Sequence, residues 1–179
     1  VELPLSENII NMFKTRVYDA AACTSHKVGV YFNDKLLNIK TIKDYAMALG
    51  GNWIGREEIR VDDDVVFEYC ILGVRKEEKE QAKCVGFVNG LQCSTGTHVD
   101  LIYRRIIEAF NDLCKKKTKK SCNIRPQQIK DSFILVVNAN LNNPSFSSQT
   151  KEKLDLRVEK FGFSYNNISA SMLLRLYYY

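Results

Sequence analysis

The spacing of apolar residues between positions 99 and 113 constrains the fold of this chain more than any other feature of its sequence. They recur at intervals of three and four, which predicts one long amphipathic helix. Before it, segments 57–62, 64–74 and 83–89 are rich in Val, Ile, Phe and Tyr and predict strands; after it, the apolar run 132–138 predicts a buried central strand. This order predicts an α/β (α+β) fold, a two-layer sandwich of sheet and helices.

The N-terminal part of the chain shows three local signals. A helical pattern occupies residues 7–22. Asn33-Asp34, between two short strand-like segments, predicts a two-residue hairpin turn. Thr41, followed three residues later by Asp44, predicts the capping box of a short helix. Near the other end, Pro126 predicts the first turn of a helix.

Composition restricts the class of protein. The chain has 179 residues, of which 45% are hydrophobic, with only three prolines, and this excludes a collagen-like or largely disordered protein. No apolar run approaches the roughly 20 residues of a membrane-spanning helix. Residues 1–7 lack the basic and apolar zones of a signal peptide. We therefore expect a soluble protein with no membrane partner.

The cysteines and histidines do not suggest a metal site. The six cysteines have irregular gaps and form no CxxC pair, and neither His26 nor His98 stands at ligand spacing from a cysteine pair. We expect free thiols in a reducing compartment rather than disulfides, and no bound metal. The six are Cys23, Cys70, Cys84, Cys93, Cys114 and Cys122.

Basic charge is concentrated in one short segment. The net charge is +5, and residues 115–130 contain seven basic and no acidic side chains, which leaves −2 for the rest of the chain. Most lysine runs are solvated, and lysines at a helix C-terminus also complement the helix dipole. Clustered cations also gain affinity for polyanions by releasing counterions condensed on phosphates. A solvated segment and a contact with a polyanion are therefore both open interpretations of the lysine run.

The chain contains no known catalytic constellation: GxSxG, HExxH, a Walker loop and GxGxxG are all missing from its sequence. The acidic triplet 62–64 is expected in a turn between strands. His98 and Asp100 are expected to cap a helix rather than to act as acid or base. The tyrosines at 177–179 are expected to be packing surface.

The segment 143–154 reads NPSFSSQTKEKL. It resembles the loop of type IIA DNA topoisomerases with the pattern N-P-x-F-x-x-Q-T-K-E-x-L, which carries a Gln-Thr-Lys switch. Other stretches match the eukaryotic and large-DNA-virus branch in the same order. Arg16-Val17-Tyr18-Asp19 matches an R-x-Y-D element, 28–40 resembles the hairpin that follows it, 86–89 matches F-V-N, and 96–100 matches G-x-H-V-D.

The resemblance implies a transducer domain, the module between the ATPase domain and the DNA-cleaving core in this GHKL superfamily. Its fold is similar to the second domain of ribosomal protein S five and is known for a left-handed β-α-β crossover, an exception to the usual handedness. Residues 1–40 would be the C-terminal edge (helix and hairpin) of the ATPase domain. Residues 41–179 would be the transducer, truncated at its C-terminal helix.

The resemblance also implies roles for particular residues. Lys151 would contact the γ-phosphate of ATP as the catalytic cation, and Gln149 would help to bind the nucleotide. Thr150 would fix the geometry of the loop. The lysine-rich loop of the family, a DNA contact, would correspond to Lys115, Lys116, Lys117, Lys119 and Lys120.

The expected cofactor is ATP with Mg2+, bound mainly by an ATPase domain whose nucleotide-binding motifs are not among these residues. The chain alone is expected to be inactive. Expected partners are double-stranded DNA, the other domains of the same enzyme and, in the parent enzyme, a second copy. Its location would be the nucleus for a cellular source, and the host cell or virion for a virus. The alternative is a stand-alone α/β nucleic-acid-binding module without nucleotide coupling.

Overall fold

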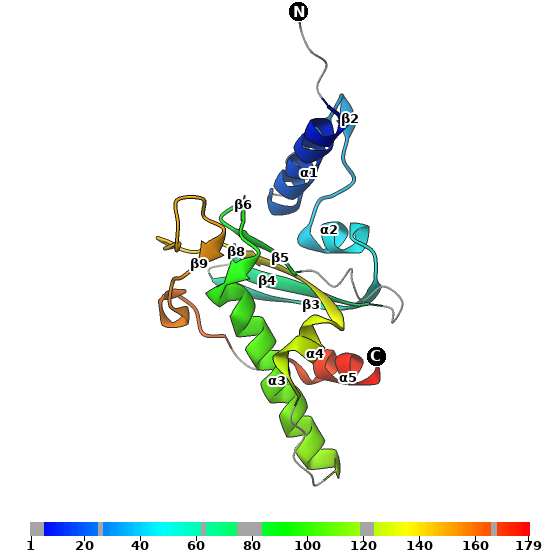
Figure 1. The fold of residues 1–179 in the computed structure, drawn as a ribbon, viewed down its shortest axis with the longest axis vertical. Helices are drawn as coiled ribbons and strands as arrows, with labels where there is room; N and C mark the ends of the chain where they lie inside the picture. Colours follow the sequence, from blue (N-terminus) through cyan, green and yellow to red (C-terminus); the bar gives the residue numbers. More distant parts are fainter. Residues whose placement is uncertain (1–5, 25–26, 62–63, 75–83, 119–123, 166–167) are drawn as a thin grey trace, which may run out of the picture.

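A five-stranded mixed sheet organises the computed structural model, which describes residues 6–24, 27–61, 64–74, 84–118, 124–165 and 168–179 (Figure 1). The strand order is β3-β4-β8-β5-β6. β8 lies at the centre, antiparallel to β4 and parallel to β5. The strands are β3 (Asn52–Val61), β4 (Asp64–Gly73), β5 (Cys84–Val88), β6 (Leu91–Gln92) and β8 (Phe133–Ala139). All seven residues of β8 are buried, which confirms the predicted central strand.

Three helices cover one face of the sheet. α3 (Thr97–Thr118) and α4 (Pro126–Lys130) form the crossover between the parallel strands β5 and β8, and α5 (Ala170–Tyr178) lies beside them (Figure 1). Ile102 and Ile106 of α3 enter a core that includes Leu135 and Val137 of β8. The apolar residues whose spacing predicts α3 therefore face this core, and those up to Ile106 are buried. α5 begins at a cap from Ser169, whose hydroxyl accepts from the Met172 amide.

The opposite face of the sheet is also covered. α2 (Ile42–Ala48) and the end of α1 (Glu7–Cys23) pack there against Cys70, Leu72 and Val136. Alternate residues of β4 and β8 thus enter different cores, which is why both strands are apolar at almost every position. The α/β class is confirmed; to the predicted sheet-and-helix sandwich the structure adds helices on the second face.

Short elements complete the fold. β1 (Tyr31–Phe32) and β2 (Lys35–Leu36) form the predicted hairpin, and the two turn residues between them have φ of 49° and 61°, as a type I′ turn requires. β7 (Thr95–Gly96) pairs in parallel with β9 (Lys153–Leu154), which is followed by the 3-10 turn Val158–Lys160. Thr41 caps α2 by accepting from the Asp44 amide, as predicted.

The sequence predicts no disulfide, no metal site and no membrane-spanning helix, and the described residues bear on all three. There, no disulfide joins Cys23, Cys70, Cys84, Cys93 or Cys114, and no group of three or more His, Cys, Asp or Glu side chains is placed to hold a metal ion. Within the same ranges, no helix has the length and apolar character needed to cross a bilayer. Cys122, the turn expected at 75–83 and the first two residues of the acidic triplet 62–64 lie outside the described residues.

Candidate functional site

The segment that resembles the switch loop forms a small hairpin beside β9, drawn in orange in Figure 1. The Ser147 amide donates to the Lys153 carbonyl oxygen at 3.0 Å, and the Asp155 amide donates to the Ser145 carbonyl oxygen at 3.0 Å. Phe146 forms an antiparallel bridge with Leu154, which is fully buried. We call residues 143–154 the switch loop. Its base is fixed to the core, and its tip, residues 148–152, faces solvent.

The side chain of Asn89 holds the chain just before the switch loop. Its Nδ2 donates to the Leu141 carbonyl oxygen at 2.9 Å, and its Oδ1 accepts from the Leu141 amide at 2.8 Å. The side-chain amide thus makes with Leu141 the two hydrogen bonds that the backbone of a neighbouring strand would otherwise make. Asn89 has φ of 50°, a conformation that Asn adopts more readily than most residues. The F-V-N motif therefore fixes where β8 ends and the switch loop begins.

The G-x-H-V-D motif holds the other end of the switch loop. The Thr95 hydroxyl donates to the Glu152 carbonyl oxygen at 2.9 Å, and the Thr97 hydroxyl donates to the Leu156 carbonyl oxygen at 2.7 Å. Between them, Gly96 lies so close to Leu154 that a Cβ atom would be 2.2 Å from its carbonyl oxygen. Only glycine allows this approach at φ of 121°. Two motifs separated in sequence thus clamp the switch loop from both sides.

His98 packs beneath this clamp and does not cap the helix. Its side chain is fully buried, and Nε2 donates to the Cys93 carbonyl oxygen at 2.8 Å. Burial lowers the pKa of His98 to about 4, so the imidazole is neutral at physiological pH. Gly86 lies against it, because a Cβ there would be 2.9 Å from Nε2. The expectation of a capping role was therefore wrong for His98, which is a core residue.

The tip of the switch loop presents the three residues of the Gln-Thr-Lys element. Gln149, Thr150 and Lys151 are all exposed. The hydroxyl groups of Thr150 and Ser148 share a hydrogen bond of 2.8 Å, consistent with a role of Thr150 in loop geometry. Lys151 has φ of 58°, its amide donates to the Ser148 carbonyl oxygen, and its Nζ lies 5.9 Å from the centroid of the Phe146 ring. Its ammonium can therefore reach an anion outside this chain.

The lysine cluster lies away from the switch loop. Its first three lysines have a different conformation from the predicted loop. Lys115, Lys116 and Lys117 form the last turn of α3 and are exposed, so these three are helical and not part of a loop. Lysine is a good helix former, and its charge complements the helix C-terminus. Nζ of Lys117 lies 4.0 Å from the ring centroid of Tyr177 in α5. Lys119 and Lys120 lie outside the described residues.

The structure does not bring the two predicted binding regions together. α3 begins beside the base of the switch loop and carries its lysines at the far end (Figure 1). Its 22 residues span about 33 Å at the usual helical rise. A nucleotide at the switch loop and a DNA segment at the lysines would therefore contact opposite ends of one helix.

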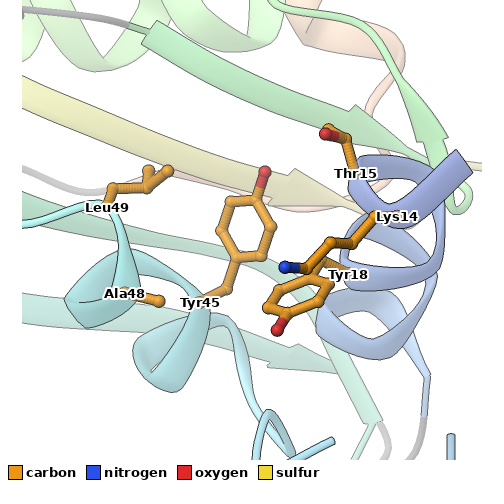
Figure 2. Close-up of a pocket in the computed structure, with 6 residues that line it drawn as sticks. All are labelled: Lys14, Thr15, Tyr18, Tyr45, Ala48 and Leu49. Carbon is orange, nitrogen blue, oxygen red and sulfur yellow. The ribbon is translucent and has the colours of Figure 1, made fainter. Parts of the chain in front are cut away.

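A third polar cluster joins α1 to α2. Asp19 is 4% exposed, and its Oδ1 accepts from the Tyr45 hydroxyl at 2.8 Å. Burial, then the hydrogen bond to Asp19, raises the pKa of Tyr45 above its usual range. Beside this contact is a cavity of about 230 Å3, which Lys14 and Tyr18 of α1 enter from one side and Tyr45 from the other (Figure 2). The R-x-Y-D element thus lies at a joint between helices.

Comparison with known proteins identifies the family. The family model described as DNA gyrase B matches residues 33–168, well over half of the chain. The chain belongs to this family of type II DNA topoisomerases. The switch loop, the F-V-N and G-x-H-V-D motifs and their two clamps all lie within the matched residues.

Relatives in the type II topoisomerase family come from eukaryotes and a large DNA virus, as the motifs predict. The DNA topoisomerase 2 of Acanthamoeba polyphaga mimivirus is 34% identical over 161 residues, which cover 88% of this chain and 12% of that protein. The DNA topoisomerase 2 of Candida glabrata is 33% identical over 177 residues, with the same coverage of 88% and 12%. The chain therefore spans only 12% of the length of these relatives.

Solved structures in the type II topoisomerase family have the same fold. The ATPase region of Saccharomyces cerevisiae topoisomerase II matches with a TM-score of 0.75 and 25% identity, over 99% of this chain and 44% of that one. The ATPase and transducer domains of DNA topoisomerase II from Balamuthia mandrillaris match with a TM-score of 0.75 and 25% identity, over 99% of this chain and 43% of that one.

Proposed function

We propose that this chain couples ATP use to DNA strand passage as part of a type II DNA topoisomerase. In this proposal residues 41–179 are the transducer and residues 1–40 are the C-terminal edge of a GHKL ATPase domain. The chain alone neither hydrolyses ATP nor cuts DNA. It acts on double-stranded DNA together with the ATPase domain and cleavage core of the same enzyme, within a homodimer. The parent enzyme acts in the nucleus of a cellular source, or in the host cell or virion of a virus.

The observation that supports this proposal most strongly is the position of Lys151. Its exposed ammonium stands at the tip of a loop that is clamped at both ends. A ligand that displaces the tip would therefore also displace the elements to which the loop is clamped, β7, β8 and α3. A lysine is a compact point charge that stabilises negative charge developing on a transferred phosphoryl group. Gln149, also at the tip, would donate a hydrogen bond from its amide to the same phosphate.

Coupling requires that the switch loop distinguish ATP from its hydrolysis product. ATP with Mg2+, held mainly by the ATPase domain, would offer Lys151 a γ-phosphate, and release of this phosphate would remove the contact. A ligand shifts a conformational equilibrium only by its difference in affinity for the two states. The loss of one charge-assisted contact supplies this difference, and the transducer would then rotate as a rigid body relative to the ATPase domain.

Replacement of Lys151 in the parent enzyme tests the proposal. Lys151→Asn removes the charge and introduces a residue that adopts positive φ more readily than lysine, whereas Lys151→Ala removes the charge and leaves the backbone strain of this position unchanged. We expect both to reduce ATP-driven strand passage about a hundredfold or more, the usual effect of removing one transition-state contact, and to leave nucleotide-independent DNA cleavage intact.

Lys153→Ala is the matched control, since Lys153 is an exposed lysine two residues away on β9. It should retain strand passage. Unchanged relaxation of supercoiled DNA by Lys151→Asn would contradict the proposal and favour the alternative, a nucleic-acid-binding module without nucleotide coupling.

A further inference from the structure

The segment 89–96, which we call the strap, contacts α1 and both ends of the switch loop. At its start, Asn89 holds Leu141 before the switch loop. At its end, Thr95 and Gly96 hold Glu152 and Leu154. The strap is short and contains both β6 and β7, and its middle is tied to β5, where the Cys93 amide donates to the Gly86 carbonyl oxygen at 2.7 Å.

The middle of the strap is joined to α1 by one side-chain contact. Nη1 of Arg16 donates to Oε1 of Gln92 in β6. The same Nη1 lies 3.4 Å from Oδ2 of Asp19. Arg16 therefore connects the strap to the carboxylate that the Tyr45 hydroxyl holds from α2.

The two contacts of this cluster differ in their exposure to water. The side chain of Arg16 is 60% exposed, so water competes for its hydrogen bonds. The Asp19–Tyr45 hydrogen bond is buried, and the Tyr45 ring packs edge-on against Phe87 of β5 with ring centroids 5.6 Å apart. Breaking it would leave the buried Asp19 carboxylate with only the longer contact from the exposed Arg16, which costs more free energy than breaking the exposed contact.

We propose that Arg16 and Gln92 form a latch and that Asp19 and Tyr45 form the pivot of the joint between α1 and the sheet. This inference rests on the proposed function, in which residues 1–40 and 41–179 rotate relative to each other. During that rotation the exposed latch opens while the buried pivot stays closed. The cavity beside Tyr45 leaves α1 room to tilt about the pivot (Figure 2).

Arg16 and Gln92 are thus positioning residues and do not touch the nucleotide. With the latch closed, α1 holds the strap, and the strap holds both ends of the switch loop in the arrangement seen here. With the latch open, α1 no longer holds the strap, whose β6 stays paired with β5, and the base of the switch loop loses the restraint that α1 supplied. The position of Lys151 then depends on the orientation of α1 even in the absence of nucleotide.

Hydrogen–deuterium exchange in the nucleotide-free parent enzyme tests the latch without using activity. In Arg16→Ala and in Gln92→Ala, we expect the switch-loop amides that donate at its base, those of Ser147 and Asp155, to exchange about tenfold faster, the effect of losing one hydrogen bond. Both changes remove the Arg16–Gln92 contact, and Arg16→Ala also removes the contact with Asp19, so the double variant should match Arg16→Ala alone and not show the sum of the two effects in free energy. Lys35→Ala, which removes an exposed cation of β2 outside the latch and the pivot, is the control and should leave this exchange unchanged.

A variant with the opposite effect keeps the test decisive if the alanine variants are poorly folded. Gln92→Glu replaces the neutral acceptor by a carboxylate, whose hydrogen bond to arginine is stronger. It should slow exchange at the same switch-loop amides. Unchanged exchange in Gln92→Ala and Gln92→Glu, or additive effects of the two alanine changes, would overturn the latch.

The exchange experiment on the latch can succeed or fail independently of the strand-passage experiment on the proposed function. If Lys151→Asn abolishes strand passage while the latch variants leave switch-loop exchange unchanged, the latch is wrong and the switch stands. If the latch variants alter exchange but Lys151→Asn retains strand passage, the strap links α1 to the loop as inferred, while the nucleotide switch is wrong.

Discussion

His98 shows how a titratable residue in a motif can serve the fold instead of the chemistry. Its imidazole is fully buried, donates one hydrogen bond to Cys93 and lies against Gly86, where no larger residue would fit. The neutral ring fills the space between the strap and β5, and its burial opposes protonation. The motif therefore requires histidine for its shape and its single donor.

Stability should fall in mildly acidic solution because of His98. Burial lowers its pKa in the folded chain from an ordinary 6.5 to about 4, so the unfolded chain binds the proton more tightly. The stabilisation is complete above pH 6.5 and is lost as the pH falls toward 4, by up to about 3 kcal/mol. Urea denaturation at pH values between 7.5 and 4 measures this loss in the free energy of unfolding.

His98→Gln retains a hydrogen-bond donor but cannot gain a proton in this range. It should be less stable than the native chain at pH 7.5 and should lose less of its stability as the pH is lowered. An equally steep pH dependence in this variant would show that other groups, and not His98, are responsible.

The sequence predicted roles for the motif residues but not their contacts. Lys151 and Gln149 were predicted to contact nucleotide from the resemblance of residues 143–154 to the loop of the family. Asn89 and Gly96 belong to recognised motifs, yet their roles as clamps were missed, because their partners Leu141 and Leu154 are about 50 residues away. An Asn-Gly pair directly after a strand signals a tight turn and cannot reveal what the asparagine side chain holds.

At the scale of elements, burial explains which predictions were accurate. β8 and β4 are covered on both faces, so their apolar runs were unambiguous. β3 begins at Asn52, five residues before its predicted start at 57. Gly55 interrupts the strand signal there, and the end of the Met172 side chain of α5 lies 2.7 Å from the place a Cβ would occupy. The sequence cannot show a contact with a helix more than 100 residues away.

The contact between β7 and β9 should depend on Gly96. In Gly96→Ala the new Cβ meets the backbone of Leu154, which cannot move without releasing the base of the switch loop. We expect a loss of about 3 kcal/mol or more in the free energy of unfolding, together with faster amide exchange in the switch loop.

Gly90→Ala separates steric contact from backbone strain. Gly90 also has positive φ, 78°, but nothing lies within 4 Å of its added Cβ. The free energy of unfolding should therefore fall only by the cost of the backbone conformation, about 1–2 kcal/mol. Equal losses in the two variants, measured by chemical denaturation, would show that the close approach to Leu154 contributes nothing.

At the scale of the whole molecule, α3 separates the two regions proposed to bind phosphates. Its N-terminus lies beside the switch loop and its C-terminus carries Lys115, Lys116 and Lys117. The buried residues of the helix lie in its N-terminal half, up to Ile106, and the half that carries the lysines extends beyond the sheet (Figure 1). The sequence predicted both regions but not their separation, since that depends on how the lysines extend the helix.

The lysine cluster should give DNA binding a steep salt dependence. If the five predicted lysines contact about five phosphates, the logarithm of the binding constant should fall with the logarithm of salt concentration with a slope near −4.5. Replacing Lys115, Lys116 and Lys117 together by alanine should bring the slope about 2.7 closer to zero. Fluorescence anisotropy with duplex DNA measures both, and a slope that the triple change leaves unaltered would favour a merely solvated cluster.

Lysine footprinting of the parent enzyme tests the central claim most directly. An amine-acylating reagent, read out by mass spectrometry, should modify Lys151 and Lys153 in the nucleotide-free enzyme, since both are exposed. A non-hydrolysable ATP analogue should protect Lys151 strongly and Lys153 little, and ADP should protect neither, because the contact requires the γ-phosphate. Equal modification of Lys151 in the presence and absence of the analogue would contradict the proposal that this lysine senses nucleotide.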